Sequence, residues 1–215
     1  MNASDSTRDR IVRAATRLFA DQGIKATTVA RIEEAVGLRK GSGGVHRYFA
    51  TKDDLVRAVF ESQVEKGREQ LGAASEMPKP AAGQVREYLE TIGRIALTKA
   101  DENREVALIM LRDAHNLPPG LLDEQHAKNF ELTYASAAAG LRDLQRAAGS
   151  DSAIDTEALG YLFLAPLIYF RLIEWATNHR ILDLDDDRLL AAWTKVFEPI
   201  FAALGAGPGA DPRPG

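Results

Sequence analysis

The sequence predicts an all-α protein, and two observations carry this prediction. Apolar residues recur at helical spacing along most of the chain, beginning with an i, i+3, i+4, i+7, i+8 stripe formed by Ile11, Ala14, Ala15, Leu18 and Phe19. No segment alternates apolar and polar residues between hairpin turns, as a strand would. We therefore expect about nine helices, arranged as a three-helix head at the N-terminus and a larger helical body.

The N-terminal head reads as three helices. The first is expected to end at Gly23, and Thr27 or Thr28 can cap a short second helix that ends at Gly37. A polar, glycine-rich stretch follows, and the helical pattern returns at 45–49. A helix, a tight turn and a second helix form the arrangement that lets one helix lie in a major groove of DNA while its neighbour braces on the backbone. We therefore predict a helix-turn-helix head.

The remainder reads as a helical body and a short tail. A long helix starts near Thr51 and runs to about residue 74, where a proline-containing segment breaks it. The last eleven residues include seven Gly or Pro and should be disordered. Further helices are expected near 85–96, 102–115, 121–148, 156–178 and 186–204. The predicted division is a DNA-binding domain at 1–54, a helical body at 55–204 and a tail at 205–215.

Charge is distributed unevenly between these parts. Residues 1–52 hold ten Lys and Arg against five Asp and Glu, whereas the rest of the chain holds 17 against 26. A basic head on an acidic body suits a polyanionic partner that touches only the head. Chance clustering on solvated helix faces is the other interpretation, so charge alone does not decide between the two.

Composition excludes several classes of protein. The chain has no cysteine, so it has no disulfide, thiolate metal site or cysteine nucleophile. Its first ten residues lack the apolar core of a signal peptide. The longest apolar run, from Ala158 to Phe170, is shorter than the roughly 20 residues that a bilayer span needs. We therefore expect a cytoplasmic protein with no membrane partner.

The sequence also offers no group of candidate catalytic residues. No grouping of a nucleophile with a base and no phosphate-binding loop is visible. The acidic stretch Asp183–Asp187 lacks the Gly and the distal Glu of a calcium-binding EF-hand, and it more simply caps the last helix. We predict no enzyme activity, no metal and no cofactor.

The candidate DNA contacts lie in and around the third helix. Short hydroxyls at a helix N-terminus can accompany backbone N–H groups on a phosphate, and Arg or Lys can bind phosphates or guanine edges. The positive charge of Lys52 interacts unfavourably with the dipole at the N-terminus of the helix that it begins. We therefore expect this charge to bind a partner outside that helix. The predicted contacts are Thr27, Thr28, Arg39, Lys40, Ser42, His46, Arg47, Tyr48 and Lys52.

The head resembles the DNA-binding region of the TetR family of bacterial regulators. The resemblance rests on TTVARIEEAVGL at 27–38 followed by VHRYFATKDDLVRAVF at 45–60. Gly37, the Tyr48-Phe49 pair and the Lys52-Asp53-Asp54-Leu55 helix start match the family pattern in order and spacing. The resemblance covers about residues 8–60. It implies a ligand-responsive transcriptional regulator, expected to be a repressor, that binds a palindromic operator in double-stranded DNA as a homodimer.

Two departures from the family pattern affect the third helix. Glu33 stands where the family usually has Ala, so its carboxylate must reach solvent or a partner such as Arg13, Arg31 or Arg47. RKGSGG at 39–44 contains an apparent two-residue insertion. Either Ser42 caps a recognition helix that begins at the next residue, or the region is loose until DNA orders it. The alternative function is a ligand-binding protein of the same fold with weakened or lost sequence-specific DNA binding.

The last two helices are apolar on more than one side, which is typical of helices that are buried on two sides. One side can face the body and the other a second subunit, as in a four-helix interface across a two-fold axis. A monomeric core is the other interpretation. The predicted interface residues are Leu162, Phe163, Pro166, Leu167, Phe170, Trp193, Phe197, Ile200 and Phe201.

The resemblance further implies a small apolar effector bound in the body. A pocket for it needs apolar walls and a few polar groups. The candidates are Met110, His115, Phe130, Tyr134, Tyr161, Tyr169, Arg171 and Trp175. Ordinary core packing is the competing interpretation for each of them, because aromatic residues at helical spacing usually belong to a core.

Overall fold

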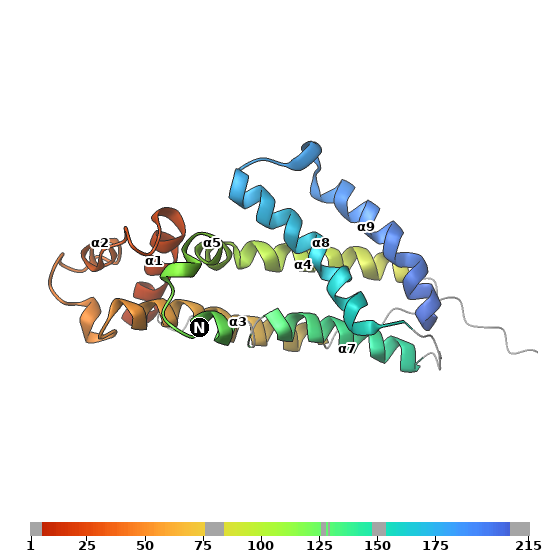
Figure 1. Cartoon of the computed structure of the whole chain (residues 1–215), viewed down its shortest axis with the longest axis horizontal. Helices are drawn as coiled ribbons and strands as arrows, with labels where there is room; N and C mark the ends of the chain where they lie inside the picture. Colours follow the sequence, from red (N-terminus) through yellow and green to blue (C-terminus); the bar gives the residue numbers. More distant parts are fainter. Residues whose placement is uncertain (1–5, 76–83, 126–127, 129, 148–153, 207–215) are drawn as a thin grey trace, which may run out of the picture. The chain divides into compact units, whose positions relative to one another are not determined.

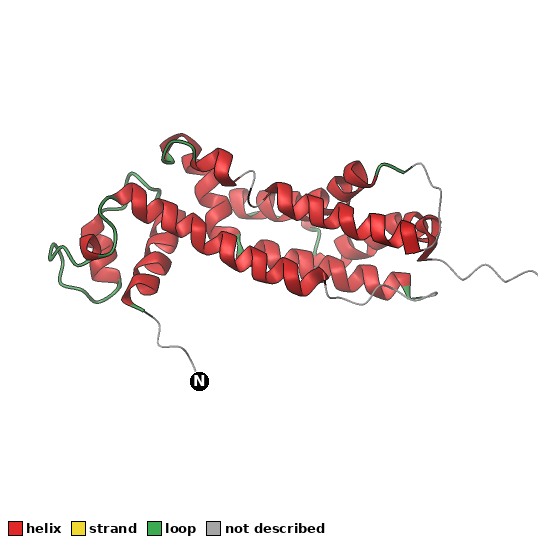
Figure 2. Ribbon diagram, turned by 90° about the horizontal axis from the view of Figure 1, so that it is seen from below, coloured by secondary structure: helices red, strands yellow, loops and turns green. Residues whose placement is uncertain are grey.

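A computed structural model describes residues 6–75, 84–125, 128, 130–147 and 154–206 (Figure 1). Every regular element in these residues is helical, which confirms the all-α prediction (Figure 2). The chain divides into two compact units. Unit 1 comprises Met1–Gln70 and Asn103–Phe130, and unit 2 comprises Leu71–Glu102 and Glu131–Gly215. Because both units are built from two separate segments, the functional division after residue 54 stays a prediction.

Unit 1 forms around the apolar stripe of its first helix. Ile11 and Phe19 are fully buried in a core that also contains Ile32, Leu55 and Phe60. These side chains come from three helices, and the apolar face of each helix is buried against the other two. The elements of this unit are α1 (Thr7–Gln22), α2 (Val29–Ala35), the 3-10 turn η1 (Val45–Arg47), α3 (Lys52–Ser75, which continues past the end of the unit), α5 (Arg104–Asp113), η2 (Ala114–Asn116) and α6 (Leu121–Gln125).

Unit 2 is a bundle in which α8 packs along α7 and α4, and α4 packs along α9. Gly160 makes the close contact of α7 and α8 possible, because a Cβ there would lie 2.8 Å from the backbone nitrogen of Ala138. The aromatic core is centred on Trp193, whose indole Nε1 donates to the carbonyl oxygen of Phe163 at 2.9 Å. The elements are α4 (Val85–Glu102), α7 (Glu131–Ala147), α8 (Thr156–Thr177), η4 (Ile181–Asp183), α9 (Asp186–Phe201) and the π-helical turn η5 (Ala202–Ala206).

The predicted start of the last helix is confirmed. Asp185 is the N-cap of α9, and its carboxylate accepts a hydrogen bond from the backbone N–H of Arg188 at 2.8 Å. The predicted tail at 205–215 lies outside the described residues from 207 onward.

One helix in the described part of the chain, α8, is long and apolar enough to cross a membrane by length and composition. In the structure α8 buries one face in unit 2, through Phe163, Leu167 and Phe170 among others. It also carries the buried Arg171, whose guanidinium contacts carboxylates from α4, α8 and α9. A buried guanidinium needs such partners, because an unpaired buried charge is strongly unfavourable.

Candidate nucleic-acid interface

The helix-turn-helix begins with α1 and α2, and Thr28 forms the start of α2. Its hydroxyl accepts a hydrogen bond from the backbone N–H of Arg31 at 3.3 Å, so Thr28 is the N-cap. The side chain is exposed and lies beside the free N–H groups of the first turn of the helix. This is the placement that a contact to a DNA phosphate needs.

Thr27 has a different place from the one expected. Its side chain is fully buried, and its hydroxyl donates to the carbonyl oxygen of Gly23 at 2.8 Å. The carbonyl oxygen of Leu18 lies 3.2 Å from the same hydroxyl. Because the one hydroxyl hydrogen is used inside the head, Thr27 is removed from the candidate DNA contacts.

The expected recognition helix capped by Ser42 is not formed. The segment folds only as the 3-10 turn η1, and Gly44 precedes this turn with no side-chain cap. Gly41 and Gly43 adopt φ values of +71° and +70°. Left-handed residues at these two positions interrupt a right-handed helix, and they keep 39–44 in a loop.

Glu33 lies under this loop and is only 1% exposed. Its carboxylate accepts hydrogen bonds from the backbone N–H groups of Gly41 at 2.6 Å and Val45 at 3.4 Å. Burial raises the pKa of Glu33, but hydrogen bonds from the backbone of Gly41, Val45, Gly44 and Ser42 outweigh it and hold the pKa below its ordinary value. The partner of Glu33 is therefore the inserted loop and not one of the arginines that the sequence suggested. Arg31, for example, donates to Gln22 Oε1 at 2.6 Å.

The remaining predicted contacts point outward. Tyr48 is 46% exposed, whereas the adjacent Phe49 is buried in the core of unit 1. Lys52 is half-buried at the start of α3; burial lowers the pKa of its ammonium group, while Asp53 and Asp113 act in the opposite direction. The other predicted contacts are exposed polar residues: Arg39, Lys40, Ser42, His46 and Arg47. The segment 39–48 thus presents several cationic side chains to a partner.

Sequence reasoning missed the residues of α5 and η2 that fix the turn between α1 and α2. The Arg112 guanidinium donates to the carbonyl oxygens of Phe19 and Ala20 at the C-terminal end of α1. The buried Asp113 carboxylate accepts from the backbone N–H of Ile24 at 3.2 Å and from the Asn116 amide at 2.9 Å. Arg112 and Asp113 lie about 90 positions from their partners in α1 and at Ile24, so no local pattern indicates these contacts.

Replacing Asp113 with Ala should lower the free energy of unfolding by about 1–3 kcal/mol, because the Ile24 N–H loses its acceptor in a buried position. Burial raises the pKa of Asp113, but hydrogen bonds from Asn116, Ile24 and Arg112 hold it below the ordinary value. A lowered native pKa means that this stabilisation is present above about pH 4 and is lost as the pH falls through the native pKa. Urea unfolding at pH 7 and pH 3 measures both effects.

Asp113→Asn is the control, since the amide oxygen can still accept from Ile24 but carries no charge. It should keep part of the stability at pH 7 and remove the contribution of this residue to acid sensitivity. An Ala variant as stable as the parent at both pH values would show that the carboxylate does not support the turn.

The predicted dimer residues separate into two groups. Most are buried in the core of unit 2 and are not on its surface: Phe163, Leu167, Phe170, Trp193, Phe197 and Phe201. Leu162 and Pro166 are exposed, and Ile200 is half-buried. The structure instead places Tyr161 and Tyr169, predicted for the effector pocket, on the exposed face of α8 beside Leu162.

The predicted effector residues belong to both units. Met110, His115 and Phe130 are in unit 1, whereas Tyr134, Tyr161, Tyr169, Arg171 and Trp175 are in unit 2. Tyr134 and Tyr161 meet with ring centroids 4.9 Å apart.

Arg171 lies 2.6 Å from Asp186, 2.9 Å from Glu174 and 3.0 Å from Asp101. Because these carboxylates already neutralise and hold the guanidinium, Arg171 is removed from the candidate polar groups of an effector pocket.

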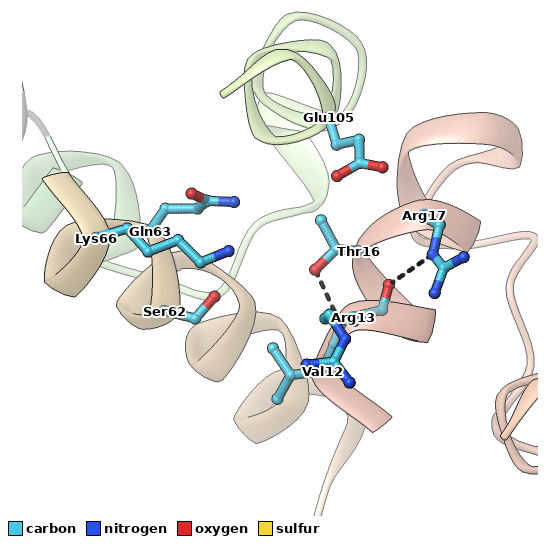
Figure 3. A pocket seen from close by; sticks show the side chains of 8 residues that line it. All are labelled: Val12, Arg13, Thr16, Arg17, Ser62, Gln63, Lys66 and Glu105. Carbon is cyan, nitrogen blue, oxygen red and sulfur yellow. Dashed lines mark hydrogen bonds between the residues drawn. The ribbon is translucent and has the colours of Figure 1, made fainter. Parts of the chain in front are cut away.

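A cavity of about 210 Å³ lies in unit 1 between α1, α3 and α5 (Figure 3). The hydroxyls of Thr16 and Ser62 donate to the carbonyl oxygens of Val12 and Val59, so their hydrogens are already used. The charged side chains that line the cavity are Arg13, Arg17, Lys66 and Glu105. Walls of this kind do not suit a small apolar effector, and none of the predicted effector residues lines the cavity.

Comparison with known proteins identifies the head. Residues 11–59 match the family model of bacterial regulatory proteins of the tetR family. Residues 11–59 therefore form a TetR-family domain. Within this TetR-family domain the match includes α2, the inserted loop and η1, the elements whose geometry is described above.

Curated relatives of the TetR-family domain are transcriptional regulators. The chain is 39% identical over 55 residues to the HTH-type transcriptional repressor KstR2 of Mycolicibacterium smegmatis, a match that covers 26% of each protein. It is 28% identical over 106 residues to the HTH-type transcriptional regulator AcrR of Shigella flexneri, which covers 49% of this chain and 47% of AcrR. The chain therefore matches from a quarter to half of the length of these relatives.

The fold extends beyond the TetR-family domain. A solved structure of a gamma-butyrolactone receptor, an ArpA-like protein, superposes with a TM-score of 0.59 at 21% identity. The superposition covers 93% of this chain and 94% of the receptor. At this identity the likeness shows a common fold for the whole chain.

Proposed function

We propose that the protein is a ligand-responsive transcriptional regulator, a repressor, that binds a palindromic DNA operator as a homodimer in the cytoplasm. The observation that carries the proposal is the segment 39–48 of the TetR-family domain. There Arg39, Lys40 and Arg47 are exposed together with Tyr48, and Thr28, the N-cap of α2, is exposed as well. Cationic and hydroxyl groups on one segment after α2 suit the phosphates and base edges of a duplex. The proposed function involves no enzyme activity and no cofactor.

A homodimer is supported by the exposed apolar side chains of unit 2. Tyr161, Leu162 and Tyr169 on α8 and Val196 on α9 are each more than half exposed. Leu162 and Tyr169 are seven residues apart, so they lie on one face of α8, and exposed apolar residues that share a helix face suit an interaction surface. A second copy of the chain suits it, because two copies related by a two-fold axis would place two TetR-family domains on the two halves of a palindrome.

The effector part of the proposal rests on the body of the chain. Tyr134 of α7 is in ring contact with Tyr161 of α8, which is 55% exposed, and the pair supplies the mixture of apolar faces and phenol groups that a small apolar ligand could use. The gamma-butyrolactone receptor that shares the fold is named for such a small molecule. We therefore expect an apolar effector with few polar groups.

DNA binding is tested with a labelled duplex from the promoter beside the protein's own gene and a scrambled duplex of equal length. We expect the promoter duplex to bind more tightly, with affinity that falls steeply as salt is raised. Lys52→Ala should weaken binding to both duplexes and flatten the salt slope by about 1, because one phosphate contact is lost. Fluorescence anisotropy at several salt concentrations measures both quantities.

Lys99→Ala is the matched control, since Lys99 lies on α4 in unit 2 and pairs with Glu102 at 2.9 Å. It removes the same charge far along the chain from the TetR-family domain, and the slope should stay as in the parent. Equal slopes for the Lys52 and Lys99 variants would contradict the assigned interface.

The second candidate function is a ligand-binding protein of the same fold with lost or weakened sequence-specific DNA binding. The observation that favours it is the shortness of η1, which leaves three residues where a recognition helix was expected. Equal affinity for the promoter and scrambled duplexes at every salt concentration would support this candidate over the first.

A further inference from the structure

The inserted loop 39–44 and the buried Glu33 depend on each other. A carboxylate buried without partners is strongly unfavourable, and a glycine-rich loop without anchors loses much conformational freedom when it is ordered. In the structure the loop gives the carboxylate its hydrogen-bond donors, and the carboxylate anchors the loop. The Glu33 oxygens lie 2.6 Å from the Gly41 nitrogen and 3.4 Å from the Val45 nitrogen. Successive backbone N–H groups around an anion form a nest, and here the anion is supplied by the chain itself.

Glu33 also holds the other end of the loop. Its own carbonyl oxygen accepts a hydrogen bond from the Leu38 N–H at 2.8 Å. One residue therefore fixes the chain where it leaves α2, in the middle of the loop and where it enters η1. A bond between the Ser42 N–H and the Arg39 carbonyl oxygen at 3.0 Å closes the intervening turn.

The glycines of the loop fit this arrangement closely. A Cβ on Gly44 would lie 2.8 Å from Leu38 Cδ1 and 3.6 Å from the Glu33 carboxylate, closer to the leucine than real side chains come. Gly41 and Gly43 supply the left-handed conformations that turn the loop back over Glu33. The loop is thus shaped by its sequence to enclose the carboxylate.

The positions of Arg39 and Lys40 follow from this anchor. The Gly41 N–H that binds Glu33 belongs to the peptide that joins Lys40 to Gly41, so the backbone of Lys40 is held directly. Arg39 is held through its carbonyl oxygen. Both side chains are exposed, whereas the negative charge of Glu33 is buried behind backbone donors and does not face a polyanion.

We propose that Glu33 is the positioning residue of the DNA-reading loop 39–44, and that Arg39 and Lys40 on this loop determine which base sequence the protein prefers. The inference rests on the proposed function, because it assigns the source of sequence preference within the same interface. A loop that is already ordered before binding loses less freedom on the DNA, which strengthens the contacts of its side chains. Side chains on a three-residue η1 offer fewer base contacts than a full recognition helix would.

The test compares Glu33→Gln with Glu34→Gln. Both substitutions remove one negative charge from α2, but Glu34 is exposed and Glu33 is buried. An amide at position 33 keeps one acceptor oxygen and places an N–H group against the donors of the loop. Amide hydrogen exchange without DNA should show about 10-fold faster exchange at Gly41 in Glu33→Gln, and no change in Glu34→Gln.

DNA binding provides the second measurement, as the ratio of affinities for the promoter and scrambled duplexes at fixed salt. Glu34→Gln should bind scrambled DNA slightly more tightly, because it loses an exposed repulsive charge, whereas the charge of Glu33 is already shielded by backbone donors. Only Glu33→Gln should lower the ratio, by about 10-fold, the effect of one good base contact. Arg39→Ala and Lys40→Ala should lower the ratio as well, with native exchange at Gly41.

The outcomes separate this inference from the proposed function. A parent protein with a ratio of one contradicts the proposed function and the specificity role together, while faster exchange in Glu33→Gln would still identify the anchor of the loop. If the parent prefers the promoter duplex and the two Gln variants share the same exchange and the same ratio, the role of Glu33 is overturned. Faster exchange with an unchanged ratio likewise overturns it, because the loop would then not read the sequence.

Discussion

Leu162→Glu should make the protein monomeric and lower its affinity for a palindromic operator by about 10²- to 10⁴-fold, since the two half-sites would no longer be bound by linked domains. Leu162 is 58% exposed on α8, and Tyr161 and Tyr169 of the same helix are 55% and 60% exposed. In a two-fold interface a substitution occurs twice, so two carboxylates would be buried without partners. Sedimentation velocity and operator titration measure the two effects.

Leu182→Glu is the matched control for this experiment. Leu182 is 86% exposed in η4, outside α8 and α9, and the substitution introduces the same charge. It should leave both the dimer and the operator affinity unchanged. A Leu162 variant that still sediments as a dimer would show that subunits meet elsewhere.

Trp193→Ala should cost about 3–5 kcal/mol of unfolding free energy, the range for removing a buried Trp or Phe side chain. The Trp193 ring lies 4.5 Å from the Phe163 ring and 5.1 Å from the Phe197 ring, measured between centroids. Truncation removes these contacts and leaves the Phe163 carbonyl oxygen without its indole donor. Urea unfolding measures the loss, and the chain's other tryptophan, Trp175, remains as a fluorescent reporter.

Trp175→Ala provides the comparison, because it is the same truncation at a half-buried position of α8. We expect it to destabilise the protein less than Trp193→Ala does. Equal losses from the two truncations would contradict the central place of Trp193 in the unit 2 core.

The fold could be predicted from the sequence because its signals are local. The stripe containing Ile11 and Phe19 is buried on one side of α1, and Gly23 ends that helix with φ of +93°. The acidic stretch before α9 supplies its cap at Asp185. Helical periodicity and end signals depend on neighbours within a few positions, so one sequence suffices to read them.

The details of the site depended on contacts that spacing does not encode. Thr27 and Thr28 are equivalent in the sequence, yet the carbonyl oxygen of Gly23 takes the hydroxyl of Thr27 into the interior. The partner of Glu33 was sought among arginines, whereas the structure supplies backbone donors of the loop. A backbone N–H group is present at every residue except proline, so a sequence gives no sign of which one a carboxylate will bind.

The dimer surface illustrates a second limit. A helix that is apolar all round predicts burial on two sides, but it does not say which side belongs to the subunit core. Phe163 and Phe170 face inward in α8, and Leu162 and Tyr169 face outward. The assignment of faces required the positions of α4 and α9, which only the structure gives.

The hydrogen bonds between Glu33 and the inserted loop also define which segment of the chain could be transferred from one TetR-family domain to another. A chimera that received 39–44 alone would place a glycine-rich loop over the side chain of its own residue at position 33, and the Gly41 N–H would lose its carboxylate acceptor. A chimera that received Glu33 alone would bury an unpaired carboxylate. The segment to transfer therefore runs from Glu33 to Val45. It is longer than the glycine-rich loop that marks the insertion in the sequence.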